Sequence, residues 1–205
     1  MTDKSAMRRT IRAARRQRPA ADRAAVGRAV ARNVMALPAV ASAGAEGRVI
    51  ACYSATQTEP PTAELVAALL ARGVRVLLPR VCGPDLEWVP AEPGRATTTG
   101  SFGIEEPTGA SAGIGFAPLA DAAAIVLPAH AVDGRGRRLG QGGGFYDRLL
   151  AAAPRHLDGG PLLAAVVFDD EILEDVPAQP HDHAVDVAVT PVRTVWFPRD
   201  GVGPA

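Results

Sequence analysis

The sequence predicts an α/β fold with a mostly parallel sheet flanked by helices on both faces, in a Rossmann-like three-layer single domain. Two observations support this prediction. Apolar segments alternate with helical patterns along most of the chain. The apolar segments are unbroken runs of Val, Ile, Leu and Ala, as expected for strands that helices cover on both faces. With 205 residues, 47% of them hydrophobic, the chain is long enough to bury one core.

The expected elements follow this alternation in order. Strands are predicted at 48–54, 74–79, 121–128, 162–168 and 185–190, and helices at 62–73 and 145–154. Thr62 is expected to cap the first of these helices, and Gly73 stands where its left-handed last residue belongs. Residues 90–120, rich in Pro, Gly, Thr and Ser, are predicted to be a long loop with little regular structure.

The composition limits the classes of function. Basic and acidic residues number 22 each, which argues against a surface built to bind nucleic acid. Only Cys52 and Cys82 could form disulfides, so a reducing cytoplasm is the expected location. No apolar stretch approaches the roughly 20 residues that cross a bilayer. A monomer without nucleic-acid or membrane partners is expected, with an Arg-rich mitochondrial presequence as the alternative for the N-terminus.

The segment 138–150, RLGQGGGFYDRLL, combines a glycine triplet with charged residues at the start of a predicted helix. Backbone amides in such a loop favour an anion such as phosphate, although a slack loop is the alternative. Neither the P-loop nor the dinucleotide motif fits, because no lysine follows the glycines and Phe145 replaces a third required glycine. Arg138 and Arg148 add positive charge. Asp147 could receive a magnesium ion that arrives with a nucleotide, or simply suit a helix start.

A basic helix is expected over about residues 3–37 of the single domain, which spans 1–205. Lys4, Arg8, Arg12 and Arg16 recur every fourth residue and would form one positive stripe on it, with Arg15 beside them. Lys4 is the only lysine of the chain, which indicates that a compact ammonium is needed there. A solvated helix face and a nucleic-acid tail are the alternatives, but no aromatic residue interrupts the stripe for base stacking.

Further candidates follow the first predicted strand and lie near the C-terminus. Glu59 is placed at the ligand edge of the sheet, with a helix-start acid as the alternative. Tyr53 and Phe102 could pack against a ligand ring or belong to the core. The run from His181 to His183 suggests a metal site, but zinc ligands usually come from separated segments, so we do not favour this interpretation.

Several segments together resemble the 5-formyltetrahydrofolate cyclo-ligase family, also called 5,10-methenyltetrahydrofolate synthetases. The segment LPAHAVDGRGRRLGQGGGFYDRLL is similar to the family signature, and further segments follow in the family's order: KSAMRRTIR, CYSATQTEPPT, LLPRV, GIEEP and PHDHAVDVAVT. The chain departs from the family pattern at Pro61, Ala129, His130, Val132 and Phe145. These departures bear on substrate affinity more than on the reaction.

The resemblance implies an ATP-dependent ligase that converts 5-formyltetrahydrofolate, in mono- or polyglutamylated form, to 5,10-methenyltetrahydrofolate, ADP and phosphate. It implies catalytic roles for Lys4 and Arg138, and Mg²⁺ held by Asp147 with Asp182 as a second candidate. The implied ATP-binding residues are Lys4, Arg8, Arg138, Leu139, Gly140, Gln141, Gly142, Gly143, Gly144, Phe145 and Tyr146. The implied folate-binding residues are Tyr53, Glu59, Phe102, Gln141, Gly142, Gly143, Gly144 and Phe145. A catalytically silent folate- or nucleotide-binding homologue and a sugar-phosphate isomerase are the alternatives.

Overall fold

The computed structural model describes residues 3–100, 103–179 and 182–198. Its central sheet has the strand order β13-β12-β10-β7-β1-β2-β3-β6. The inner strands β12 (Val187–Val189), β10 (Leu162–Val166), β7 (Ala122–Pro128), β1 (Val49–Ala51) and β2 (Arg75–Cys82) run parallel. The outer strands β13 (Thr194–Trp196), β3 (Asp85–Pro90) and β6 (Gly113–Ile114) pair antiparallel. The prediction of a mostly parallel sheet is confirmed.

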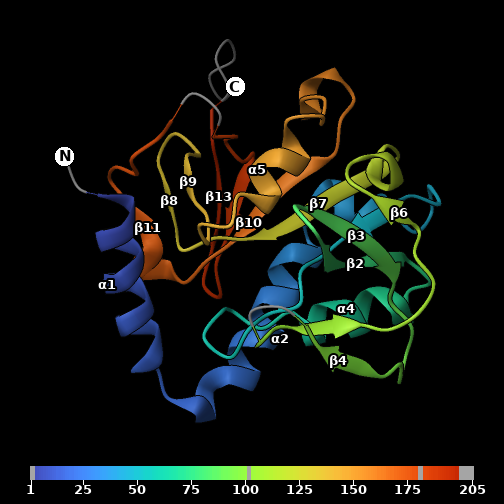
Figure 1. Cartoon of the computed structure of the whole chain (residues 1–205), viewed down its shortest axis with the longest axis horizontal. Helices are drawn as coiled ribbons and strands as arrows, with labels where there is room; N and C mark the ends of the chain where they lie inside the picture. The colour runs from blue at the N-terminus through green and yellow to red at the C-terminus, as the bar shows by residue number, and fades with distance from the viewer. Residues whose placement is uncertain (1–2, 101–102, 180–181, 199–205) are drawn as a thin grey trace.

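Helices cover both faces of this sheet (Figure 1). Ile50 and its neighbours pack against α2 (Arg23–Met35), α3 (Pro38–Ser42) and α4 (Ala63–Ala71). Ala51, the next residue, lies in the cluster on the opposite face with α5 (Phe145–Leu150). Successive residues of a strand point to opposite faces, so an unbroken apolar run supplies both clusters. This arrangement explains why the strands lack polar alternation.

Within residues 3–100, 103–179 and 182–198, two smaller sheets and several short 3₁₀ segments complete the fold. One sheet joins β11 (Ile172–Leu173), β8 (Ala131–Asp133) and β9 (Arg138–Leu139), and the other joins β4 (Thr97–Thr99) and β5 (Glu105–Pro107). The 3₁₀ segments are η1 (Ala20–Asp22), η3 (Ala117–Leu119), η4 (His156–Asp158) and η5 (Asp169–Glu171). The expectation of little regular structure over 90–120 is therefore only partly correct, because short strand pairings organise this excursion.

The basic helix expected over about residues 3–37 is two helices. The first, α1 (Lys4–Arg16), is capped by Asp3, whose carboxylate accepts a hydrogen bond from Ser5 N at 3.1 Å. Pro19 and η1 then separate α1 from α2. Proline disfavours helical geometry in the residue before it, which explains the break. Figure 1 shows the result: α1 stands beside β11 at one side of the molecule, while α2 packs under the sheet.

The predicted ends of α4 are half correct. Gly73 has φ +73°, the left-handed conformation expected after the helix. Thr62 is in the cap position, but its oxygen accepts no hydrogen bond from a backbone N–H of the helix, as a cap would. Its hydroxyl instead donates to Tyr53 O at 2.7 Å. Thr62 thereby ties the start of α4 to the chain just after β1. The helix α5 ends at Leu150, four residues earlier than predicted.

The chain reverses its direction of progress across the sheet at β1. From β1 it moves outward through α4 to β2 and β3, and it later returns to β7 on the other side of β1. Ligands of open α/β sheets bind beyond the carboxyl ends of the strands at such a reversal. Tyr53, Glu59 and His130 all follow β1 or β7 at this edge. Within the described residues, no helix is long and apolar enough to span a membrane.

Candidate functional site

A cavity of about 1130 Å³ opens at the carboxyl edge of β1 and β7. Most residues expected at the site line it: Lys4, Arg8, Tyr53, Glu59, Arg138, Gly140, Gln141, Gly142, Gly143, Gly144, Phe145, Tyr146, Asp147 and Asp182. Leu139 does not, because its side chain is fully buried with Ile11 beneath α1. Phe102 and His181 lie outside the described residues. This volume exceeds the usual range of 300–1,000 Å³ for a single small-ligand site, which leaves room for two ligands.

The glycine loop lies under α1. Arg8 Nε donates to Gly140 O at 2.8 Å, and Arg12 Nη2 donates to Gln141 O at 3.0 Å. Gly142 and Gly144 have φ of +106° and +69°, so the loop needs glycine there for its own backbone path. α5 has only 6 residues, so an anion at this place would depend on the loop amides and the α1 cations more than on a helix dipole.

Lys4 occupies the first turn of α1 and faces Asp182. Its Nζ donates to Asp182 Oδ2 at 2.6 Å, and the two side chains are 18% and 12% exposed. Gln179 N also donates to this carboxylate, at 2.6 Å. The only lysine of the chain therefore lies at the cavity wall, where it contacts an aspartate 178 residues away in the sequence.

Arg138 is buried beside the glycine loop. Its Nη2 donates to Asp147 Oδ1 at 2.5 Å, and its guanidinium lies 6.0 Å from the centre of the Tyr146 ring. Burial lowers the pKa of Arg138, while Asp147 opposes this shift. The buried Nε has no hydrogen-bond partner, so the guanidinium keeps unused donor capacity. In the described part of the chain, no cluster of three His, Cys, Asp or Glu residues is suited to hold a metal ion.

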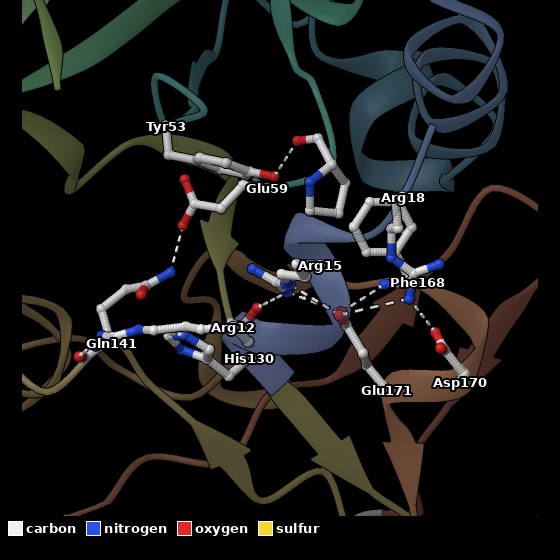
Figure 2. Close-up of polar contacts among 12 residues, drawn as sticks. Arg12, Arg15, Arg18, Tyr53, Glu59, His130, Gln141, Phe168, Asp170 and Glu171 are labelled. Atoms are coloured by element: carbon white, nitrogen blue, oxygen red, sulfur yellow. Dashed lines mark hydrogen bonds and ion pairs between the residues drawn. The ribbon is translucent and has the colours of Figure 1, made fainter. Parts of the chain in front are cut away.

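Glu59 is 4% exposed and already has hydrogen-bond donors on both oxygens. Thr56 N donates to Oε2 at 2.8 Å, and Gln141 Nε2 donates to Oε1. Figure 2 shows the Gln141 amide reaching across the cavity toward Glu59. Tyr53 lies alongside and donates its hydroxyl to Pro60 O at 2.8 Å. Burial raises the pKa of the Tyr53 phenol, so it stays protonated. Tyr53 belongs both to the core and to the cavity wall.

Arg15 is buried, so the alternative of a solvated helix face is wrong for this residue. Its residue is 3% exposed, and its guanidinium makes two hydrogen bonds of 2.7 Å to the Glu171 carboxylate and one of 2.7 Å to Ala129 O (Figure 2). Burial works against the charged form, but Glu171 outweighs it and the pKa of Arg15 is raised. Arg15 therefore fastens the last turn of α1 to η5 and to the end of β7.

His130, one of the departures from the family pattern, is 1% exposed and contacts Arg12. Arg12 Nε donates to His130 Nε2 at 3.1 Å, so Arg12 is also not merely solvated. Burial and the neighbouring Arg15, Arg12 and Arg8 lower the pKa of His130 to about 3. The imidazole is thus neutral at physiological pH and acts as an acceptor for Arg12.

Two cavity features escaped the sequence interpretation. The buried face of α1 runs through Met7 and Ile11, and Arg15 continues it one turn later, so helical spacing could have shown that Arg15 points inward. Glu106 is 7% exposed in the cavity wall. It lies in the segment GIEEP that contributed to the family resemblance, but the sequence does not show that Glu106 is buried while Glu105 is exposed.

The structure defines an α/β protein with a large cavity at the carboxyl edge of a mostly parallel sheet, walled by a basic helix and a glycine loop. Residues 1–191 match the 5-formyltetrahydrofolate cyclo-ligase family, and the chain belongs to this family. The family predicted from the sequence, and with it the class of enzyme, is confirmed.

Individual relatives agree with this assignment. A 5-formyltetrahydrofolate cyclo-ligase from Mycolicibacterium smegmatis is 38% identical over 156 residues, which cover 73% of this chain and 76% of the relative. The NMR structure of 5,10-methenyltetrahydrofolate synthetase from Aquifex aeolicus is 26% identical with a TM-score of 0.76, covering 98% of this chain and 96% of that one. The Mycoplasma pneumoniae enzyme of the same name has the same fold, with a TM-score of 0.68, 17% identity and coverage of 93% and 99%.

Proposed function

We propose that this protein uses ATP to cyclise 5-formyltetrahydrofolate to 5,10-methenyltetrahydrofolate, releasing ADP and phosphate. Family membership over residues 1–191 supports the reaction. The observation that carries the ATP requirement is the meeting of Lys4 and Arg8 with the glycine loop 140–144 in one cavity. Backbone amides and converging cations are the groups that bind phosphate chains.

The chemistry requires an activated formyl oxygen, because an amide-like oxygen is a poor leaving group. In the proposed first step, the formyl oxygen attacks the γ-phosphorus of ATP and the bond to ADP breaks. In the second step, N10 attacks the resulting iminium carbon, the carbon–oxygen bond breaks with loss of phosphate, and N10 releases its proton. Protein groups in such a transfer mainly position the reactants and neutralise charge.

The cationic residues have distinct parts in this scheme. Lys4 leaves Asp182 to contact the phosphoryl group in transfer, and Arg8 holds the phosphate chain against the glycine loop. The buried Arg138 neutralises the charge that develops on the phosphoryl oxygens, for which its unpaired Nε supplies a donor. The low dielectric of its buried position strengthens this effect.

The carboxylates Asp147 and Asp182 would hold Mg²⁺ together with the phosphates. Magnesium is usually bound by one or two carboxylates plus substrate oxygens, so the small number of acidic groups at this wall fits the ion. When bound, Mg²⁺ supplies charge neutralisation between the phosphates. Both carboxylates now pair with cations, and those cations would turn toward the phosphates instead.

The folate would lie beside the nucleotide, with its pterin near Glu59. We propose that Glu59 accepts hydrogen bonds from the pterin N–H groups once Gln141 Nε2 moves away, and that Phe145 and Tyr53 flank the ring. The exposed residues Arg9, Arg12 and Arg16 line the same cavity and offer positive charge to a glutamyl or polyglutamyl tail. Gln141 would thus respond to both ligands, because the glycine loop carries it.

A labelling experiment tests the reaction and its mechanism. The intact protein is incubated with 5-formyltetrahydrofolate, heavy-isotope-labelled at the formyl oxygen, with and without ATP and magnesium. We expect methenyl absorbance to appear only with ATP, and the label to move into inorganic phosphate. Light phosphate from fully labelled substrate would contradict the phosphorylated intermediate. Folate binding without any methenyl product would instead indicate a catalytically silent homologue.

A further inference from the structure

Glu106 is a buried carboxylate in the cavity wall that the proposed chemistry does not use. It is 7% exposed, and its Oε1 accepts a hydrogen bond from Val81 N at 3.1 Å. Among the described residues, no Lys, Arg or His forms an ion pair with it, and Oε2 accepts no hydrogen bond. A buried carboxylate without a cation is unfavourable unless something else supplies donors. Because Glu106 lines the cavity, a ligand can be that supplier.

The surrounding chain makes room for this carboxylate. A Cβ atom at Gly100 would overlap the carboxyl carbon and both oxygens of Glu106. The φ of Gly100 lies outside the left-handed region, so its backbone does not itself demand glycine. The adjacent Glu105 points the other way, is exposed, and accepts a hydrogen bond from Thr99 Oγ1 at 3.3 Å. The inward carboxylate is therefore accommodated specifically at residue 106.

This part of the cavity differs from the wall that α1 forms. Here β2, β3 and the residue before β5 contribute the lining residues Pro79, Val81, Leu86 and Ile104, and Val81 N contacts Glu106 directly. The cationic wall contains Lys4 and Arg8 on α1, and Figure 1 shows α1 on the opposite side of the molecule from β2, β3 and β4. An apolar wall with a single carboxylate suits a flat ring that carries N–H donors, whereas the α1 wall suits phosphates.

We propose that Glu106 accepts a hydrogen bond from the exocyclic amino group of the pterin, as a second acceptor beside Glu59. This inference rests on the proposed folate substrate. The pyrimidine edge of a tetrahydropterin carries one ring N–H and two amino hydrogens, which is more than a single bidentate carboxylate accepts. Glu59 has donors on both oxygens, whereas Glu106 presents an oxygen without a partner among the described residues. Glu106 therefore determines specificity for a 2-amino ring.

Binding measurements on the full chain test this role. Glu106→Gln keeps an oxygen for Val81 N but removes the charge, so the Kd for 5-formyltetrahydrofolate should rise at least about tenfold while the Kd for ATP stays within about twofold. Gly100→Ala, which displaces the carboxylate without neutralising it, should weaken folate binding in the same direction. Glu105→Gln is the matched control and should leave both affinities unchanged. Isothermal calorimetry measures the Kd values for folate and for ATP in the wild type and in the three variants.

Two further readouts separate this role from a structural one. The ligand-free Glu106→Gln protein should unfold at the same or a higher temperature, because the substitution removes an unpaired buried charge. A 2-desamino analogue of the folate should bind weakly to the wild type and lose little further affinity in Glu106→Gln. Three results for Glu106→Gln would each overturn the proposal: an unchanged affinity for folate, a loss of affinity for ATP but not for folate, or a lower unfolding temperature. A wild type that binds folate as described but forms no methenyl product would contradict the proposed reaction alone.

Discussion

The two ends of α1 carry ion pairs of similar length and opposite character. At the last turn, Arg15 and Glu171 are 2.7 Å apart, and their side chains are 1% and 4% exposed. At the first turn, Lys4 and Asp182 are 2.6 Å apart, with exposures of 18% and 12%. The Arg15 pair is bidentate and completed by Ala129 O, whereas the Lys4 contact is a single hydrogen bond.

This difference indicates a division of labour along one helix. A buried, fully hydrogen-bonded pair is costly to break because either partner alone would be left as an uncompensated charge. A partly exposed single contact is exchanged easily for another anion. The Arg15 end therefore anchors α1, whereas the Lys4 contact is the weaker of the two and is the one that would be exchanged in the proposed reaction. The distances in the two pairs are nearly equal, so the difference in their strength comes from burial and from the number of hydrogen bonds.

Breaking the anchor should have the largest effect. Arg15→Ala leaves the buried Glu171 carboxylate with only the more distant Arg18, whose Nη2 is 3.9 Å from Oε1, and we expect a loss of about 3 kcal/mol in the free energy of unfolding. Denaturant titration measures this change. Glu171→Gln added to Arg15→Ala should restore part of it, because the amide no longer buries a charge. Arg16→Ala, an exposed change on the same helix, is the control and should cost under about 1 kcal/mol. Equal losses for Arg15→Ala and Arg16→Ala would refute the anchor.

Changing the other end should affect turnover more than stability. If Lys4 contacts the phosphoryl group in transfer, Lys4→Ala should lower kcat by about 100-fold or more. Its free energy of unfolding should change by only about 1 kcal/mol, because the pair with Asp182 is a single, partly exposed contact. Steady-state kinetics with Arg16→Ala as the matched charge removal separates these effects. A small and equal loss of kcat in both variants would reduce Lys4 to part of a solvated basic face.

A smaller effect should arise from His130, which lies between the two ends. Its pKa falls from 6.5 to about 3 on folding, through burial and then Arg15, Arg12 and Arg8. The unfolded chain therefore binds the proton more readily between these two pH values, so the stabilisation present above pH 6.5 is lost as pH falls toward 3. From pH 7 to pH 5 we expect a loss of about 2 kcal/mol in the free energy of unfolding.

The test compares the wild type with His130→Leu by denaturant titration between pH 5 and pH 7. The variant should lose the larger part of this pH dependence, since leucine does not titrate. The other three histidines of the chain are present in both proteins, so the difference between the two titrations isolates residue 130. Identical slopes in the two proteins would mean that the imidazole is not shielded from protons as its burial indicates.

Several features of this protein were determined by the sequence itself. Unbroken apolar strands between helical patterns led to the parallel sheet, because burial on both faces removes the need for polar alternation. Gly73 predicted the end of α4, because its left-handed backbone is a local property. The motif segments predicted the family, which the match over residues 1–191 confirms. These inferences depend on local backbone preferences and on the order of residues along the chain.

The partners of charged side chains were decided only by the tertiary structure. Arg15 and Glu171 are 156 residues apart, and Lys4 and Asp182 are 178 apart, so nothing local to either residue selects its partner. Lys4, Arg8, Arg12 and Arg16 share one helical spacing, yet Arg8 and Arg12 contact the glycine loop while Arg16 is exposed, and Arg15 beside them is buried. Glu106 likewise differs from Glu105 only in the side of β5 that it occupies. Helix docking and strand register set burial, and burial determines whether a charge anchors the fold, binds a ligand or faces water.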